Sequence, residues 1–287
     1  MKTFYFPLEE LFKKGLRPRT DMPANGKFLL SCDNAKPSPQ GLIEVSKFTR
    51  SFNLNEDAYV FECFAGIFVL TATKVYSYAN SVLTEELADI PENFPWDCAD
   101  FRGYIVFTNG LVNVIRSSAG TFSIDDGTAL PVAKTICNFR GRAFVGNLKY
   151  DVTRDINWGD TNWVGWSEIG YLEFPSPLAL STNRKNTGGF MPMPWEGNVY
   201  KVLPLGKAVI VYGNGGVTAL PMATVGPVST FGQKHLSDLG VIGELAVTAN
   251  GKEDAATKHY FVRVDGMLCS IDLDLKVTEL GYNEFLL

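Results

Sequence analysis

The sequence repeats a hairpin pattern, and this repeat constrains the fold more than any other feature. Each copy has a glycine and a variable residue, about three apolar residues, a turn of small residues and a second apolar stretch. The copies start at Gly26, Gly66, Gly103, Gly141, Gly206 and, without the glycine, Lys258. The first four are spaced by 40, 37 and 38 residues, and the later spacings are 65 and 52. A period of this length indicates a repeat architecture.

Turn signals divide each copy into two strands. "TNGL" at 108–111 and "VDGM" at 264–267 place Asn-Gly or Asp-Gly between apolar residues, which favours a type I′ hairpin turn. "GNGG" at 213–216 fits a slightly longer turn. The segments "FECFAG", "CADFRG" and "ICNFRG", which precede three of the glycines, predict an incoming strand and a tight turn. Each repeat therefore supplies three to four antiparallel strands.

Repeats of about 40 residues with four short strands are typical of propeller blades. We therefore predict an all-β, β-propeller-like fold of about six blades over residues 26–287. A sandwich or barrel built from ordinary hairpins is the alternative, and the WD and kelch signatures are absent. Residues 1–25 are expected to form an N-terminal arm with a short helix at 7–16, where Glu comes early, Lys late and Gly15 ends the helix.

Residues 151–198 interrupt the period and are predicted to be a long irregular insert. A loop of this length inside a compact domain is usually functional or mediates contacts. Its aromatic residues could stack a sugar or a base, or could anchor packing between blades or between subunits. Tryptophan is common at interfaces, which favours packing. The candidate interface residues are Trp158, Trp163, Trp166, Phe190 and Trp195.

Composition and motifs argue against most catalytic classes. The five cysteines form no C-x-x-C pair and are interpreted as reduced, buried residues of a protein made in the cytoplasm. The two histidines, His235 and His259, form no zinc motif, and His259 is expected to have a surface or structural role. Neither a nucleophile elbow nor a phosphate-binding loop is present. No apolar run spans a bilayer, and the N-terminus does not resemble a signal peptide.

Three carboxylate pairs were considered for glycosidase chemistry: Asp125/Asp126, Asp272/Asp274 and Glu85/Glu86. Each is interpreted as part of a turn or a strand edge. "SIDDGTAL" at 123–130 resembles a sialidase Asp-box turn, which is itself structural. "DINWGD" at 155–160 resembles the start of a calcium loop but has Trp166 where the bidentate Glu is expected. We predict no catalytic residue, no cofactor and no metal.

Several motifs resemble tailed-bacteriophage virion proteins of the propeller-bearing tail-nozzle type. The likeness is carried by Trp166, Ser167, Ile169 and Gly170 of "WSEIG", by the loop from Asn186 to Phe190, and by the strand pair from Val202 to Val211. An opening segment with Asp33, Asn34, Pro39, Gly41 and Leu42 is also similar. The resemblance covers residues 15–50 and 140–222, and this chain is shorter than most such proteins.

The resemblance implies a non-enzymatic structural protein of the virion tail, neck or nozzle. Such a protein would form a ring around the DNA channel, with copies of itself and neighbouring tail or portal-side proteins as partners. A net charge of −5 fits a wall that DNA passes without specific binding. The alternatives are a glycan-binding or glycan-cleaving propeller, which needs a solvent-facing aromatic pocket near carboxylates, and a peptide-binding scaffold.

Overall fold

A computed structural model describes residues 35–38, 41–44, 54, 56–125, 130–149, 160–174, 188–225, 228–251 and 255–281. The predicted helix at 7–16, the first repeat at Gly26 and Trp158 lie outside these ranges. The chain divides into two units, residues 1–53 and 54–287. In the first unit, β1 (Ala35–Ser38) pairs with β2 (Gly41–Glu44) as an antiparallel hairpin.

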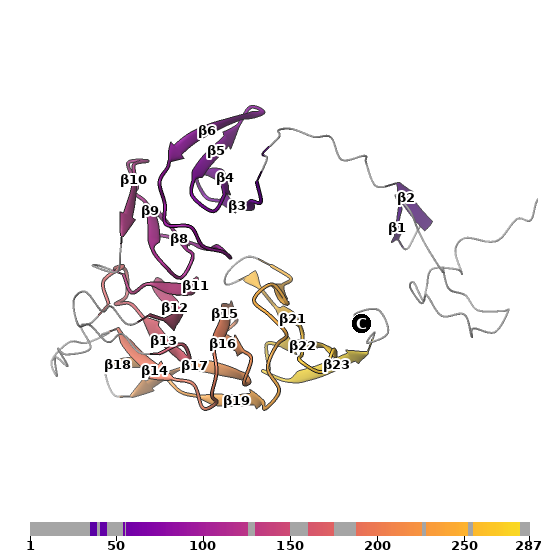
Figure 1. Cartoon of the computed structure of the whole chain (residues 1–287). Coiled ribbons are helices and arrows are strands. Elements are labelled where there is room, and N and C mark those ends of the chain that lie inside the picture. Colours follow the sequence, from indigo (N-terminus) through magenta and orange to yellow (C-terminus); the bar gives the residue numbers. More distant parts are fainter. Residues whose placement is uncertain are drawn as a thin grey trace, which may run out of the picture. The chain divides into compact units, whose positions relative to one another are not determined.

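The described residues of the second unit form five antiparallel sheets, here called the first to fifth blades (Figure 1). The first blade holds β3 (Tyr59–Cys63), β4 (Gly66–Leu70), β5 (Val75–Ala79) and β6 (Val82–Leu87). The second holds β7 (Asp97–Phe101), β8 (Tyr104–Thr108), β9 (Asn113–Arg116) and β10 (Phe122–Asp125). The third holds β11 (Ala133–Phe139), β12 (Arg142–Leu148), β13 (Trp163–Trp166) and β14 (Gly189–Pro192).

The fourth blade holds β15 (Val199–Leu205), β16 (Ala208–Gly213), β17 (Val217–Val225) and β18 (Val228–Phe231), with β19 (Lys234–Ser237) also paired to β17. The fifth holds β20 (Val247–Ala249), β21 (Lys258–Val262), β22 (Leu268–Asp272) and β23 (Val277–Gly281). Every neighbouring pair within a blade is antiparallel. The prediction of an all-β fold is confirmed.

The repeat corresponds to the second and third strands of the first, second, fourth and fifth blades, and in the third blade it covers β12 alone. Gly66 begins β4, Lys258 begins β21, and Gly103, Gly141 and Gly206 lie in the turns before β8, β12 and β16. Arg102-Gly103 and Arg140-Gly141 connect first and second strands with positive φ at both residues, as a type I′ turn requires. The recurring glycine therefore marks the first turn of a blade.

The type I′ prediction for the second turns was wrong, although the hairpins themselves form. Residues 109–112 separate β8 from β9, and only Gly110 among them has positive φ. The Asn109 side chain instead accepts backbone N–H bonds from Leu111 and Val112 at 2.9 and 3.0 Å. The same holds for 263–267, where Asp265 accepts the N–H of Met267. Side chains that satisfy the backbone in this way favour longer loops.

The expected irregular insert is in part regular structure. Its described residues include β13 and β14, the third and fourth strands of the third blade. β13 pairs with β12 through Phe144↔Trp166 and with β14 through Trp166↔Gly189. The sequence pattern hid these strands because they are only four residues long and contain glycine.

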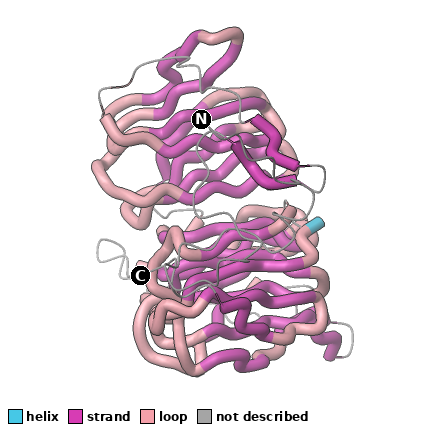
Figure 2. The backbone as a smooth tube through the Cα atoms, turned by 90° about the vertical axis from the view of Figure 1, so that its right-hand side faces the viewer, coloured by secondary structure: helices cyan, strands magenta, loops and turns pink. Residues whose placement is uncertain are grey.

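Successive blades pack face to face. Four buried clusters join the first blade to the second, the second to the third, the third to the fourth, and the fourth to the fifth. Their first strands also meet, since β7 contacts β3 and β11, and β11 contacts β15. All residues of β12 and β16 are buried, because both faces of these strands are covered. Figure 1 shows the blades following one another around a common centre, and Figure 2 shows their strands in successive layers.

Candidate functional site

The four described candidate interface residues, Trp163, Trp166, Phe190 and Trp195, do not form an exposed aromatic platform. Trp166 and Trp195 are only 5% and 8% exposed and belong to the cluster between the third and fourth blades. Trp163 and Phe190 are half-buried and pack toward the second blade. Strand alternation explains the separation, because Trp163 and Trp166 point to opposite faces of β13. A role for these residues between subunits stays a prediction.

Trp166 is the centre of an aromatic seam between the third and fourth blades. Its ring lies 6.0 Å from Phe144 in a stacked arrangement and 5.2 Å from Phe231 in an edge-to-face one. Phe144 and Phe231 are themselves 4.8 Å apart at 87°. A Cβ at Gly189 would come within 2.6 Å of the Trp166 ring. The glycine of "GGF" is therefore needed to seat this tryptophan.

Trp195 explains the glycine-rich segment at 213–216. Its indole Nε1 donates to Thr218 Oγ1 at 2.9 Å. A Cβ at Gly213 or Gly216 would lie 2.3 or 2.6 Å from the indole ring. These glycines let the backbone approach a buried ring and do not form a phosphate-binding loop.

The "WSEIG" turn, which follows β13, is hydrogen-bonded to the hairpin that β11 and β12 form. The N–H of Ser167 donates to the Ala143 carbonyl, and the Ser167 hydroxyl accepts from the Ala143 N–H, both at 2.9 Å. The N–H of Gly170 donates to the Gly141 carbonyl at 2.7 Å. Arg142 Nη1 donates to the Ser167 carbonyl at 2.8 Å. Each polar position of this motif thus supports the architecture of the blade.

A cavity of about 820 Å³ opens where the first strands of four blades converge. Here we call it the axial cavity. Its lining comes from β3, β7, β11 and β15 and the segments around them: Phe61–Phe64, Asp97–Asp100, Ile136–Asn138, Lys201, Leu203, Pro204 and Gly251. Its lining includes three cysteines, three carboxylates and the Lys201 ammonium group. No sequence motif indicates this site.

Asp97 organises the polar contacts beside the axial cavity. This carboxylate is only 6% exposed. Its Oδ2 accepts from Thr135 Oγ1 at 2.6 Å and from the Ile136 N–H at 3.0 Å. Its Oδ1 accepts from Lys201 Nζ at 2.6 Å and from the Cys98 N–H at 2.9 Å. A buried charge is tolerated when it is paired and fully hydrogen-bonded, so Asp97 ties together the second, third and fourth blades.

The strand register offers a signal that could have found this network. Asp97, Thr135 and Lys201 occupy the same position of successive first strands, each four residues before the strand's last paired residue. If the repeats are aligned on the last paired residue of each first strand, these three polar side chains fall at the same position of the alignment. Tyr59 occupies the corresponding position in the first blade, where burial and then the charge of Glu244 raise its pKa.

A second cavity, of about 730 Å³, is more apolar. It is lined by Tyr59, Phe94, Pro95, Tyr200, residues 242–246 and Val262. Leu245 and Ile242 are 76% and 55% exposed at its edge. Glu244 is its one carboxylate and pairs with Lys134 at 3.1 Å.

The predicted structural role of His259 agrees with its surroundings. The side chain is fully buried, with Nδ1 2.9 Å from the Tyr212 hydroxyl and Nε2 3.0 Å from the Pro204 carbonyl. Burial lowers the pKa of His259 to about 4, so the ring is neutral near pH 7. His235 is on the surface, 2.7 Å from Asp238.

The carboxylates considered for glycosidase chemistry support turns and strand edges. Asp272 accepts the backbone N–H groups of Asp274 and Lys276. Glu85 pairs with Lys74 at 2.7 Å, and Glu86 accepts from Ser77 at 2.6 Å. Asp125 accepts the N–H of Leu130, while Asp126 and residues 155–159 lie outside the described ranges. These contacts agree with the interpretation made from the sequence.

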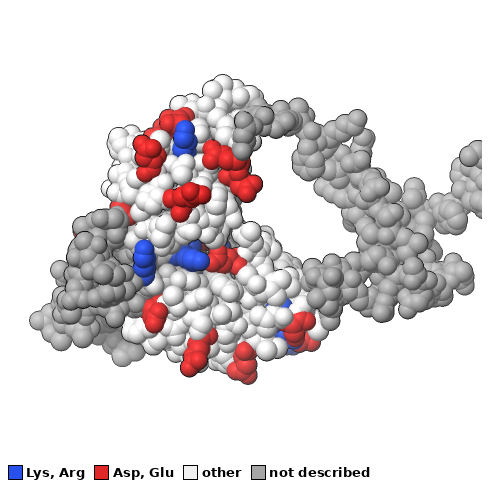
Figure 3. All heavy atoms as spheres, in the orientation of Figure 1, with Lys and Arg blue, Asp and Glu red and all other residues white. Residues whose placement is uncertain are grey.

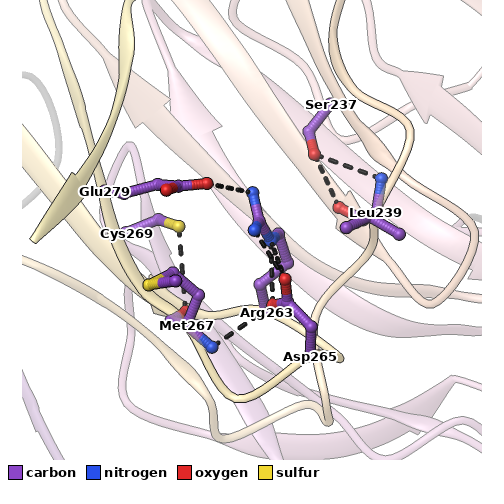
Figure 4. Close-up of polar contacts among 7 residues, drawn as sticks. All are labelled: Ser237, Leu239, Arg263, Asp265, Met267, Cys269 and Glu279. Atoms are coloured by element: carbon purple, nitrogen blue, oxygen red, sulfur yellow. Dashed lines mark hydrogen bonds and ion pairs between the residues drawn. The ribbon is translucent and has the colours of Figure 1, made fainter. Parts of the chain in front are cut away.

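Ion pairs of Arg263 hold the "VDGM" loop of the fifth blade (Figure 4). Arg263 bridges Asp265 at 2.5 Å and Glu279 at 2.9 Å. The hydrogen bond to Asp265 raises the pKa of Arg263 and lowers that of Asp265. This arrangement closes a loop and holds β23 beside it.

No protein-family model and no curated protein matches the sequence. In the described residues, no group of His, Cys, Asp or Glu side chains could hold a metal ion. Among the helices of the described part, none has the length and apolar character needed to cross a membrane.

Solved structures similar to this chain are β-propeller proteins. One is the extracellular domain of a hybrid two-component system from B. thetaiotaomicron, with a TM-score of 0.50 and 11% identity. Another is a streptogramin B lyase, with the same TM-score and identity. The matches cover 79% and 87% of this chain, which spans 28% and 76% of those chains. At this identity the likeness shows the fold alone: this is a β-propeller-like protein.

Proposed function

We propose that the chain is a non-enzymatic structural subunit of a tailed-phage tail, neck or nozzle. It would assemble as a ring around the DNA channel through its insert, residues 151–198. Its partners would be copies of itself and neighbouring tail or portal-side proteins. The virion would be its destination after synthesis in the bacterial cytoplasm.

The observation that carries this proposal is the set of contacts made by the residues that resemble virion proteins. Trp166, Ser167 and Gly170 fasten the third blade together, and Gly189 seats the Trp166 ring. The contacts of these motif residues therefore build the blade. This supports descent from a structural propeller of the same type, because an architectural motif is retained only with its architecture.

Charge is consistent with a passive channel wall. The chain has a net charge of −5. On the face drawn in Figure 3, acidic side chains outnumber basic ones and no broad basic patch appears among the described residues. Strong duplex binding requires several Lys or Arg contacts to phosphates. We therefore expect DNA to pass such a surface without being retained.

Ring assembly is tested on the purified full chain by multi-angle light scattering and negative-stain electron microscopy. We expect closed rings, alone or after addition of the virion proteins that flank the chain. Replacing two basic residues of the insert by acidic ones, Arg184→Glu and Lys185→Glu, should reduce assembly. Lys207→Glu and Lys258→Glu, which change charge equally outside the insert, should not.

The same preparation tests the virion assignment. Labelling of phage particles with antibody against the chain should mark the tail. A monomer that is absent from particles and binds glycans would overturn the proposal. Retention of fluorescent duplex DNA at physiological salt would contradict the passive-wall part of the proposal alone.

A glycan-binding propeller remains the second candidate, and one observation favours it. The 730 Å³ cavity combines three aromatic rings, Tyr59, Phe94 and Tyr200, with the carboxylate of Glu244. Sugars stack on such rings and bind such carboxylates through hydroxyl groups. Glycan-array binding that Tyr200→Ala abolishes, and that Tyr171→Ala outside the cavity does not, would support this candidate.

A further inference from the structure

Two cysteines of neighbouring blades meet beside the axial cavity. Cys63 ends β3 and Cys98 lies near the start of β7, and their sulfur atoms are 3.4 Å apart. Both belong to the lining of the axial cavity, which is large enough to admit a small reagent. Cys63 is 9% exposed and Cys98 is half-buried. Both thiols are free in the structure.

We propose that Cys63 and Cys98 form an oxidation site, at which a small-molecule disulfide converts the two thiols into a disulfide between the first and second blades. A disulfide bond length is about 2.05 Å, so the sulfur atoms must approach by about 1.4 Å. The contact between β3 and β7 already holds the two strands side by side. The change is therefore local to two side chains and the adjoining backbone.

The exchange has two balanced steps. One protein thiolate attacks the small disulfide, forms a mixed disulfide and releases one small thiolate. The other protein thiolate then attacks the protein sulfur of that mixed disulfide and releases the second small thiolate. Two protein thiols are oxidised, the small disulfide is reduced to two thiols, and the two protons pass to these products.

The location gives the bond a consequence for stability. The first blade packs on the second through one buried cluster. On its opposite sheet face Val60 and Ile67 are 62% and 36% exposed, so the seam with the second blade is the largest buried contact that the described residues show for this blade. A disulfide across that seam would restrict the unfolded chain and hold the first blade in place.

Thiol chemistry predicts the conditions. Burial, and then the hydrogen bond shared with Cys63, raise the pKa of the Cys98 thiol well above its ordinary value. Since the thiolate is the reacting form, the exchange should be slow near neutral pH and faster as the pH rises. The two thiols would therefore stay reduced during brief exposure to the small-molecule disulfide and form a disulfide during prolonged exposure.

Mass spectrometry of the folded, full-length chain provides the test, with bis(2-hydroxyethyl) disulfide as the probe. We expect the loss of two hydrogen atoms and a link between the tryptic peptides 51–74 and 75–102, which carry the two cysteines. Thermal unfolding should shift upward by several degrees after oxidation of the wild type and of Cys269→Ala. Cys63→Ala and Cys98→Ala should show no shift.

Three results would overturn the proposal. The first is a persistent hydroxyethyl adduct on either cysteine without a cross-link. The second is no reaction at alkaline pH while the chain stays folded. The third is a cross-link that appears only in urea. Because the wild type alone reports each result, instability of a variant does not affect the conclusion.

Discussion

The two faces of the fourth blade bury similar clusters by different chemistry. Toward the third blade, the seam contains the rings of Phe144, Trp166 and Phe231. Toward the fifth blade, the seam contains mostly aliphatic residues, with Phe261 and the Tyr212–His259 hydrogen bond among them. Among the described residues, the aromatic centre of the first seam has no titratable group, whereas the second seam depends on a histidine that must stay neutral. One sheet therefore separates a seam held by ring packing from a seam whose stability depends on pH.

Removal of the central ring should break the first seam. Trp166→Ala deletes contacts to two rings in a buried cluster and is expected to lower the free energy of unfolding by about 3–5 kcal/mol. Urea denaturation monitored by circular dichroism measures the change. Trp163→Ala, on the same strand but half-buried, should cost clearly less. Equal losses would mean that the seam does not depend on the Trp166 position.

Acid should weaken the second seam. The pKa of His259 is lowered from 6.5 to about 4, so the unfolded chain binds more protons than the folded chain between these values. Stability from this group is therefore complete above pH 6.5 and is lost as pH falls toward 4. The stability difference between wild type and His259→Gln should shrink by about 3 kcal/mol from pH 7 to 4.

The exposed histidine provides the control for this titration. His235→Gln keeps the buried His259 and should therefore still lose stability as the pH falls from 7 to 4. A His259→Gln profile parallel to the wild type would contradict the neutral, buried state assigned to His259. Urea midpoints at half-unit pH intervals resolve the two cases.

The axial end of the blades offers a third kind of contact, in which charge joins the blades. Asp97→Asn retains the shape of the side chain but removes the charge that Lys201 and three further donors share. Hydrogen bonds to charged groups contribute about 1.5–3 kcal/mol, so a loss of about 2 kcal/mol is expected. Asp100→Asn, on the same strand, should cost less, and a double-mutant cycle with Lys201→Met measures the coupling. A coupling near zero would exclude a cooperative network.

The fold class could be predicted from the sequence because single residues mark the hairpin turns. Positive φ at Gly103 and Gly141 requires the recurring glycine, and the apolar runs of β12 and β16 require cover on both faces. β13 and β14 were missed because the pairing of β13 with β12 and of β14 with β13 is set by contacts distant in sequence. Local pattern cannot report such pairing when strands are this short.

The axial cavity was missed for a related reason. Asp97, Thr135 and Lys201 are different residue types, separated by 38 and 66 positions, and nothing local distinguishes them from surface residues. Only the shared register of the first strands brings them together. Burial of Trp166 was expected from its type, but its partner Phe231 lies 65 positions away and could not be identified.

The smallest effect expected here concerns the turn that borders the aromatic seam. Ser167→Ala leaves the buried N–H of Ala143 without the hydroxyl that accepts it, which should cost about 1–2 kcal/mol in urea denaturation. Ser123→Ala, at an exposed strand position, should change stability by less than about 0.5 kcal/mol. If both variants behave alike, ring packing alone holds β13 in place, and the "WSEIG" turn is a consequence of that packing.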